Sequence, residues 1–375
     1  MPKIRRPRLT AAVAAAGALA AAAPELSGQA APNPYRPVEW GELPEGREWG
    51  PLNGIYADPD GLHIWFADRC GHTPLPFSTQ ESCLFKPDVA PILKLDLEGN
   101  LVASFGEGLF VRPHGLHVDG EGNVWVTDYS PTQAYGHTEE EALAEMARRR
   151  IGHQVHKFSP DGELLMSLGT GAVPGDGPDH FRQPSNVLVT PAGEILVADG
   201  HGDGGNNRIA RFTSDGTYIG EWGETGTARG QFLDPHDLAM DSQGRLFVAD
   251  RGNYRIQIFD QDGNLLDIWT QFGKPDGLFI DANDVLYVTD ALSRPGSNTG
   301  WEQGIRIGDA RTGWVEAFIL NPSPADGAGG WEGVTADVYG NIYATEPRPS
   351  MEVRRSQHVQ KFVNVRSRPA EQRGR

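Results

Sequence analysis

Pro113-His-Gly-Leu-His-Val-Asp119, followed after a short turn by Asn123-Val-Trp-Val-Thr-Asp128, is one copy of a pattern that occurs six times in this 375-residue chain. Each copy pairs a first apolar run with a second apolar run that ends in an acid. The six first runs begin at Leu52, Pro113, Pro184, Pro235, Pro275 and Trp331. Such a repeat fixes the architecture, because each unit can bury its apolar faces only against its neighbours.

The two runs of each unit read as antiparallel strands joined by a tight turn, such as Asp119-Gly-Glu-Gly-Asn123. In most units a second hairpin follows, as in the segment from Ile92 to Phe105. The 47 glycines and 28 prolines of the chain suit a protein rich in turns. Four strands in each of six units predict an all-β fold, a six-bladed β-propeller over residues 51–365.

Two further segments complete this prediction. The sixth unit lacks a fourth strand, and we expect the N-terminal segment 31–50 to close the ring with a strand near Pro37-Val-Glu-Trp40. A helical insertion is predicted over 138–150, because Thr138 and Glu141 form a capping box and arginines end the segment. This helix leaves the face of the ring that carries the histidines, so it is either a lid or a solvated decoration.

Both ends of the chain differ in composition from the repeat region. Residues 1–30 combine basic residues with a small-residue apolar run, which predicts a signal peptide of the Sec or twin-arginine type and export to the periplasm or the extracellular space. Residues 366–375 form a basic tail predicted to be disordered. The formal net charge of −17 argues against a nucleic-acid partner. No later stretch is apolar enough for a membrane span, and we expect a monomer.

Cys70 and Cys83 are the two cysteines of the chain, and they lie in one stretch rich in proline, serine and threonine. In an exported protein a disulfide that closes this loop is the favoured interpretation. The alternative is a metal pair, which would need more thiol or imidazole neighbours than His72 alone.

Polar residues occupy the same place in every unit, just before the innermost strand, where we expect them to lie near the central axis at one mouth of the channel. These residues are Asn53, His114, Ser185, His236, Asp276 and Glu332. His114, His236 and Glu332 come from alternate blades, and two imidazoles with a carboxylate are the donors of a catalytic zinc site. Asp276 is a rival third ligand. The alternative is that these residues only bind water in the channel.

A second ring of residues follows the acid at the end of each second strand, and it includes Arg69, Tyr129, His201 and Arg251. Arg69 and Arg251 could clamp a substrate carboxylate. For Arg251 a salt bridge between blades is the favoured interpretation. His201 is a candidate acid–base group or, alternatively, a turn histidine that faces solvent.

These residues resemble the NHL-repeat propellers and, more closely, the peptidyl-α-hydroxyglycine α-amidating lyases. The resemblance runs from about Asp68 to the last unit. It rests on the segment from Leu109 to Asp128, on His180-Phe-Arg-Gln-Pro184, on Val197-Ala-Asp-Gly200 followed by Asn207-Arg-Ile209, and on Gly230-Gln-Phe-Leu-Asp-Pro-His-Asp-Leu238.

The resemblance implies cleavage of a peptidyl-α-hydroxyglycine to a peptide amide and glyoxylate, with a zinc ion held by three channel histidines. It places His114 and His236 among these ligands and the substrate-binding arginine of the family at Arg69. Three positions depart from the family. Its third histidine maps to Glu332, its catalytic tyrosine to His201, and an aspartate of its calcium site to Gly333, which makes calcium doubtful.

The sequence thus predicts an exported metal-dependent lyase that acts on a small molecule or a peptide. Two alternatives stay open: a non-catalytic NHL propeller that binds a peptide or protein on its top face, and a metal-dependent hydrolase of the lactonase type.

Overall fold

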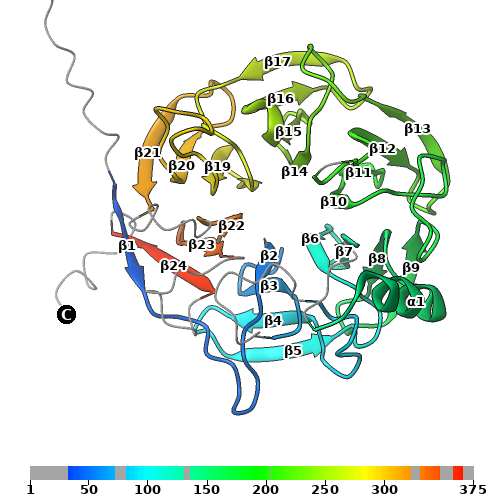
Figure 1. The fold of residues 1–375 in the computed structure, drawn as a ribbon. Coiled ribbons are helices and arrows are strands. Elements are labelled where there is room, and N and C mark those ends of the chain that lie inside the picture. The colour runs from blue at the N-terminus through cyan, green and yellow to red at the C-terminus, as the bar shows by residue number, and fades with distance from the viewer. Residues whose placement is uncertain are drawn as a thin grey trace, which may run out of the picture. The chain divides into compact units, whose positions relative to one another are not determined.

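The structure is a computed structural model that describes residues 33–71, 82–130, 136–202, 204–321, 330–346 and 358–365. The predicted signal peptide and basic tail lie outside these residues. Six four-stranded antiparallel sheets surround a central axis (Figure 1), so the predicted six-bladed β-propeller is confirmed. Among the described residues, no helix has the length and apolar character needed to cross a bilayer.

In each of the first five blades, the four strands follow one another in chain order, from the innermost strand at the axis to the outermost strand (Figure 1). The first three blades consist of β2 (Leu52–Ala57), β3 (His63–Asp68), β4 (Ile92–Asp96) and β5 (Leu101–Phe105); β6 (Pro113–Val118), β7 (Val124–Asp128), β8 (Gln154–Phe158) and β9 (Leu164–Leu168); and β10 (Pro184–Val189), β11 (Ile195–Asp199), β12 (Arg208–Phe212) and β13 (Tyr218–Trp222).

The next two blades consist of β14 (Pro235–Met240), β15 (Leu246–Asp250), β16 (Arg255–Phe259) and β17 (Leu265–Trp269); and β18 (Leu278–Ile280), β19 (Val285–Asp290), β20 (Gly304–Asp309) and β21 (Val315–Leu320). A short 3-10 helix, η1 (Arg251–Asn253), follows β15.

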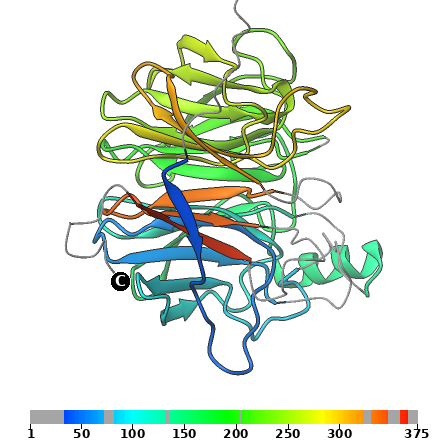
Figure 2. The same ribbon diagram turned by 90° about the vertical axis from the view of Figure 1, so that its left-hand side faces the viewer.

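The sixth blade is assembled from both ends of the described chain. It consists of β22 (Gly333–Ala336), β23 (Ile342–Thr345), β24 (Val359–Asn364) and β1 (Tyr35–Val38). Tyr35 is paired with Asn364 and Val38 with Lys361, and Figures 1 and 2 show β1 against β24 at the outside of the ring. The outer edge of β24 is therefore covered by β1. This strand lies within the segment 31–50, which was predicted to close the ring.

The aspartate that ends the first run of a unit organises the following turn. Oδ1 of Asp119 accepts hydrogen bonds from the backbone N–H groups of Glu121 (3.0 Å) and Asn123 (2.9 Å). Its Oδ2 accepts one from Nε1 of Trp125 (2.9 Å), a residue of the second strand. Both backbone contacts recur at Asp241, Asp281 and Asp337, and Asp58 makes the first of them, with the N–H of Asp60. This side chain replaces backbone acceptors in the turn, which explains why the repeat contains it.

In the first five blades, the acid that ends the second strand binds the backbone segment that precedes the innermost strand. Asp128 is fully buried, and its carboxylate accepts hydrogen bonds from the backbone N–H groups of Val111 (2.9 Å) and Arg112 (2.7 Å). Asp68, Asp199, Asp250 and Asp290 hold the equivalent segments of their blades. These bonds fix the chain just before it enters the innermost strand, and therefore fix the polar residue that faces the axis.

The hydrophobic core is divided among the interfaces between blades. Trp65 and Phe105 of the first blade pack with Val124, Val126 and Phe158 of the second in one cluster of buried side chains. Similar clusters join the other neighbouring blades. Each blade is stabilised by its neighbours, as expected for a repeat protein.

The predicted helix forms as α1 (Glu139–Arg149), with the capping box between Thr138 and Glu141 in place. Its buried residues Ala142 and Met146 pack against Leu84, Val111 and Ile151. Figures 1 and 2 show α1 at the rim of the ring beside β8 and β9, projecting from the face toward the viewer of Figure 1. The helix is therefore docked on the rim and does not lie across the axis.

Candidate metal centre at the channel mouth

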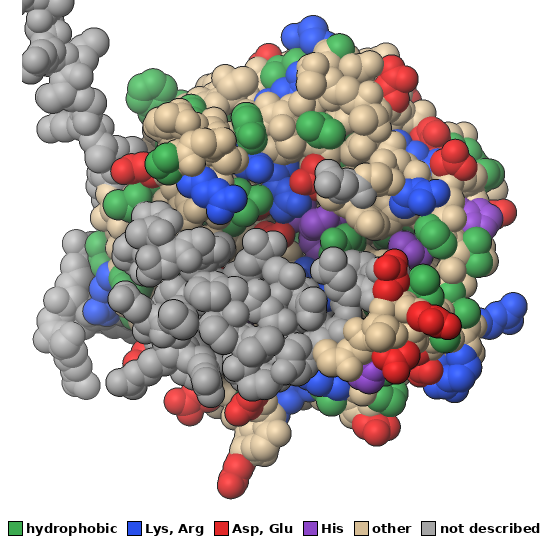
Figure 3. All heavy atoms as spheres, in the orientation of Figure 1, with side chains coloured by type: hydrophobic (Ala, Val, Ile, Leu, Met, Phe, Trp, Pro, Cys, Tyr) green, Lys and Arg blue, Asp and Glu red, His purple; other side chains and the backbone are tan. Residues whose placement is uncertain are grey.

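Four side chains converge at one mouth of the channel. The metal-binding atoms of His114, His201, His236 and Glu332 all lie within 4.8 Å of one another. Figure 3 shows histidine side chains near the middle of this face. The structure thus brings together the three predicted ligands and adds His201, for which an acid–base role was predicted.

The innermost strands place His114 and His236 in equivalent positions. Each is the second residue of its strand, β6 and β14, and each is nearly fully buried. Nδ1 of His114 lies 2.8 Å from the carbonyl oxygen of Ser185, and Nδ1 of His236 lies 2.9 Å from that of Asp276. A carbonyl oxygen only accepts, so each Nδ1 carries a proton, and in the neutral imidazole Nε2 is then the nitrogen that has the lone pair. Metal-binding histidines are commonly oriented in this way, by a hydrogen bond from the ring nitrogen that does not bind the metal.

Glu332 lies directly before β22, and its backbone is held on both sides. Its N–H donates to the carbonyl oxygen of Thr345 (2.8 Å), and its carbonyl oxygen accepts from Oγ1 of Thr289 (2.6 Å). Its Oε1 lies 3.0 Å from Nε2 of His236, close enough for an ion pair, although this buried nitrogen makes no hydrogen bond within the described residues.

The rival ligand Asp276 is engaged elsewhere. Its Oδ1 forms an ion pair with Nη1 of Arg251 (2.9 Å), and its Oδ2 accepts the backbone N–H of Ala291 (2.7 Å). With both oxygens bound, its carboxylate does not join the four-residue cluster. The other channel candidates also differ in position: Oγ of Ser185 donates to the carbonyl oxygen of Pro235 (2.6 Å), whereas Nδ2 of Asn53 lies 3.3 Å from Nε2 of His114.

Arg251 links the centre to the neighbouring blades. This buried guanidinium contacts Asp234 (2.8 Å), Asp276 (2.9 Å) and Glu332 (3.3 Å). Burial lowers the pKa of Arg251, but the three carboxylates outweigh it and raise the pKa above its usual range. The salt bridge between blades that was favoured for Arg251 is therefore present.

The charge states within the cluster follow from burial and proximity. Burial, followed by the neighbouring imidazoles, holds the pKa of both His114 and His201 well below the usual value, so both are neutral at pH 7. Burial raises the pKa of Glu332, but His236 and Arg251 together hold it well below its usual range. Burial and then Arg251 lower the pKa of His236, but Glu332 and Asp276 outweigh them and raise it above its usual value. A cation binds to the neutral form of an imidazole and to the ionised form of a carboxylate, so its binding at His236 would compete with a proton.

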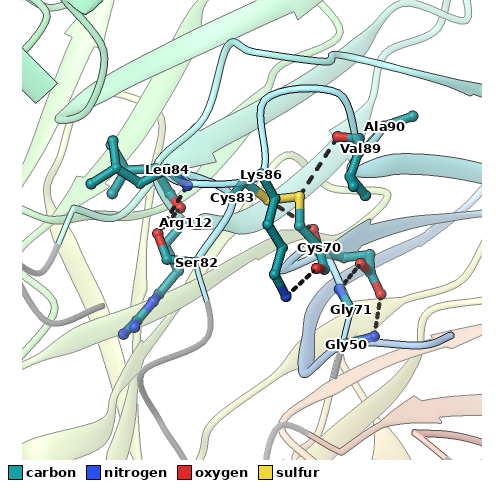
Figure 4. The surroundings of a disulfide bond; sticks show 12 residues. Gly50, Cys70, Gly71, Ser82, Cys83, Leu84, Lys86, Val89, Ala90 and Arg112 are labelled. Atoms are coloured by element: carbon teal, nitrogen blue, oxygen red, sulfur yellow. Dashed lines mark hydrogen bonds between the residues drawn. A yellow bond between two sulfur atoms is a disulfide. The ribbon is translucent and has the colours of Figure 1, made fainter. Parts of the chain in front are cut away.

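Arg69 and the disulfide lie at the same mouth. Arg69 follows β3, is 7% exposed, and its positive charge lowers the pKa values of His114 and His201, which places it near the cluster. The predicted disulfide between Cys70 and Cys83 is present, and Nζ of Lys86 donates to the carbonyl oxygen of Cys70 (2.9 Å; Figure 4). The backbone that follows Arg69 is thereby fixed.

No role was predicted for Tyr129, although it occupies the same repeat position as Arg69 and Arg251. Its ring centroid lies 4.2 Å from that of His201, with an angle of 31° between the planes, and 5.4 Å from that of His114. The repeat alignment is the signal that could have identified it.

The donor set fits a divalent transition-metal ion. Nε2 of His236 and Nδ1 of His201 are buried and have no hydrogen-bond partner among the described residues, which would cost about 1–3 kcal/mol each if nothing bound them. Imidazoles with a carboxylate are ligands of zinc and of several other transition metals. At Gly333, a Cβ atom would lie 2.0 Å from the carbonyl oxygen of Asn53, so no calcium-binding side chain occupies that position.

A second group of possible ligands, Asp58, Asp60 and His63, lies away from the channel mouth. Nζ of Lys94 lies 2.7 Å from Asp58 and 3.7 Å from Asp60. This ammonium group already balances the carboxylates, so these residues form a salt-bridge cluster.

Known proteins resemble this chain in sequence and in fold. A family model described as NHL repeat matches residues 232–259. The chain is 34% identical over 232 residues to peptidyl-glycine alpha-amidating monooxygenase B of Xenopus laevis, covering 56% of this chain and 23% of that protein. It is 31% identical over 215 residues to the probable peptidyl-alpha-hydroxyglycine alpha-amidating lyase pgal-1 of Caenorhabditis elegans, covering 55% and 54%. The chain thus spans about a fifth and about half of these two relatives.

Among solved structures, a gluconolactonase from Xanthomonas campestris superimposes with a TM-score of 0.53, covering 84% of this chain and 87% of that one at 14% identity. At this identity the likeness concerns the fold alone. The repeat model, the six blades and the named relatives agree with one another. The chain is a six-bladed β-propeller that contains a match to the NHL repeat at residues 232–259 and resembles the peptidyl-α-hydroxyglycine α-amidating lyases.

Proposed function

We propose that this chain is an exported, metal-dependent lyase of the amidating-lyase type. In this proposal it breaks a C–N bond at a hydroxylated carbon and uses a zinc ion held by His114, His236 and Glu332. The observation that carries the proposal is the convergence of these side chains within 4.8 Å at the channel mouth. The sequence relatives named amidating lyase support the same reaction class.

In this reaction the substrate hydroxyl loses its proton, its C–O bond becomes a C=O bond as the C–N bond breaks, and the leaving amide nitrogen takes up a proton. When bound, zinc supplies a Lewis acid that lowers the pKa of a coordinated oxygen. The chain itself supplies the orientation: the carbonyl groups of Ser185 and Asp276 fix the two imidazoles, and Arg251 limits the movement of the Glu332 carboxylate.

Arg69 is the group proposed to bind the substrate. A guanidinium can bind a carboxylate through two parallel hydrogen bonds, and it keeps its charge at any physiological pH. The disulfide that follows Arg69 holds its backbone. A substrate with a terminal carboxylate next to the hydroxylated carbon, either a small molecule or a peptide, matches this pair of features. His201 is available either as a proton acceptor or as a further ligand.

The proposal is tested with the purified mature protein. Metal content is measured by elemental analysis, and glyoxylate release is measured from an N-acyl-α-hydroxyglycine. We expect close to one zinc ion per chain and glyoxylate release, with both lost in His114→Ala and His236→Ala and with metal lost in Glu332→Gln. His137→Ala is the matched control, because His137 is exposed and stacks on Phe85 outside the cluster.

The outcomes separate the alternatives. Protein that binds no metal would refute an enzyme of this type and leave a propeller that binds partners. Protein that binds metal but hydrolyses a lactone without releasing glyoxylate would refute the lyase in favour of a hydrolase. Metal content unchanged in Glu332→Gln would refute Glu332 as the third ligand.

A further inference from the structure

We propose that His201 is a metal ligand, so that the ion at the channel mouth is held by three imidazoles and one carboxylate. This inference rests on the proposed metal centre, but it replaces the acid–base role predicted for His201. It also predicts an ion that accepts five or six ligands, because four protein ligands fill a tetrahedral ion and leave no position for substrate.

The first argument is the position of the ring. The centroid of His201 lies 4.6 Å from that of His114 and 5.0 Å from that of His236, while His114 and His236 are themselves 5.0 Å apart. The three rings are therefore nearly equidistant, and none is set back from the others. A base that acts on a bound substrate would be expected farther from the two ligands, with the substrate between them.

The second argument is the unsatisfied nitrogen. Nδ1 of His201 is buried and has no hydrogen-bond partner among the described residues. Nε2 of His236 also has no hydrogen-bond partner among the described residues, and both residues belong to the cluster in which one metal-binding atom of each side chain lies within 4.8 Å of the others. A shared cation would satisfy both nitrogens and the Glu332 carboxylate at once.

The third argument is that the chain fixes His201 in place. Its backbone N–H donates to the carbonyl oxygen of Gln183 (3.0 Å), and the next N–H, of Gly202, donates to Oδ1 of Asp234 (2.9 Å). The other oxygen of Asp234 binds Arg251, which also contacts Glu332. The ring of Tyr129 packs on the imidazole at 4.2 Å. The backbone next to His201 is thus linked through the side chains of Asp234 and Arg251 to the carboxylate of Glu332, as a preorganised metal site requires.

The test is a titration of the chelator-treated mature protein with Co²⁺ alone, followed by visible absorption, which reports the ligands and the coordination number of the ion. We expect His201→Ala to raise the dissociation constant for Co²⁺ by at least about tenfold and to change the absorption bands. Free imidazole added to His201→Gly should restore the bands of the original protein. His201→Gln, which keeps more of the side-chain volume, repeats the measurement if the smaller variants do not fold, and His137→Ala is the control.

The results distinguish this inference from the proposed function. If His201→Ala binds Co²⁺ with unchanged affinity and bands, while His114→Ala and His236→Ala lose it, the metal centre stands and His201 is not a ligand. If none of the three histidine variants changes Co²⁺ binding, both proposals are wrong. A Co²⁺ spectrum of a four-coordinate ion that stays unchanged when substrate is added would overturn the predicted higher coordination number.

Discussion

Replacing Arg251 with methionine should destabilise the propeller strongly. Methionine keeps much of the apolar stem and removes the guanidinium that contacts Asp234, Asp276 and Glu332 at 2.8, 2.9 and 3.3 Å. The side chain of Asp276 is 0% exposed and that of Glu332 is 13% exposed, so water cannot readily replace the lost partner. Removing one partner of a buried ion pair costs about 3–5 kcal/mol, and we expect the free energy of unfolding to fall by that amount.

The assay is urea unfolding followed by tryptophan fluorescence, in the presence of a chelator so that no divalent cation balances the carboxylates. The matched control is Arg311→Met, which removes an exposed arginine paired with Asp309 alone and should cost less than about 1 kcal/mol. The double variant Arg251→Met/Asp276→Asn should recover part of the loss, because one stranded carboxylate is gone.

The loss in free energy of unfolding caused by Arg251→Met should also depend on pH. Burial raises the pKa of Asp276 to about 6 even beside Arg251, and without the guanidinium this pKa should rise further. The stranded carboxylate can then take up a proton, so the stability difference between Arg251→Met and the original protein should narrow as the pH falls through about 6. A loss no larger than that of Arg311→Met, or a loss independent of pH, would show that the network does not stabilise the fold.

Three further predictions concern the packing of the channel, the disulfide and a buried carboxylate. Gly115→Ala should lower the free energy of unfolding in urea by about 1–3 kcal/mol, because the added Cβ would lie 2.4 Å from a backbone oxygen of the next blade. Gly120→Ala should be nearly neutral, because no atom lies within 4 Å of the added Cβ. Equal effects of the two substitutions would contradict this prediction. Replacing Cys70 and Cys83 with serine should cost about 3 kcal/mol, measured in the same way, and a reductant should have no further effect on the double variant. Burial raises the pKa of Asp128 from 3.8 to about 6, so its contribution to stability is complete below pH 4 and is lost as the pH rises through 6. The free energy of unfolding of Asp128→Asn should therefore rise relative to that of the original protein between pH 4 and 7. Parallel pH profiles of the two proteins would refute this prediction.

The repeat allowed much of the fold to be predicted. The phase of the apolar runs placed six residues around the axis, and the acids that end those runs explain why the placement is regular. His114 and His236 occupy equivalent positions because their blades have the same local sequence. Local patterns of this kind depend on contacts within one blade, which a single sequence can show.

The remaining features depend on contacts between blades. His201 enters the cluster because its loop is bound to Gln183 and Asp234, and no pattern within that loop specifies these partners. Asp276 is drawn away from the axis by Arg251 of another blade. Both side chains were identified as candidates, but their choice of partner is a tertiary effect.

Pairing of β1 with β24 has a consequence for how this protein is made and handled. The first and last strands of the described residues complete the same sheet, so the ring can close only after residues 35 to 364 have all been synthesised. A partly made chain would expose an open strand edge, which invites pairing with other chains. Affinity tags and fusions placed at the start should therefore leave residues 35–38 free to dock, and deletion of those four residues should produce self-association before it affects the channel mouth.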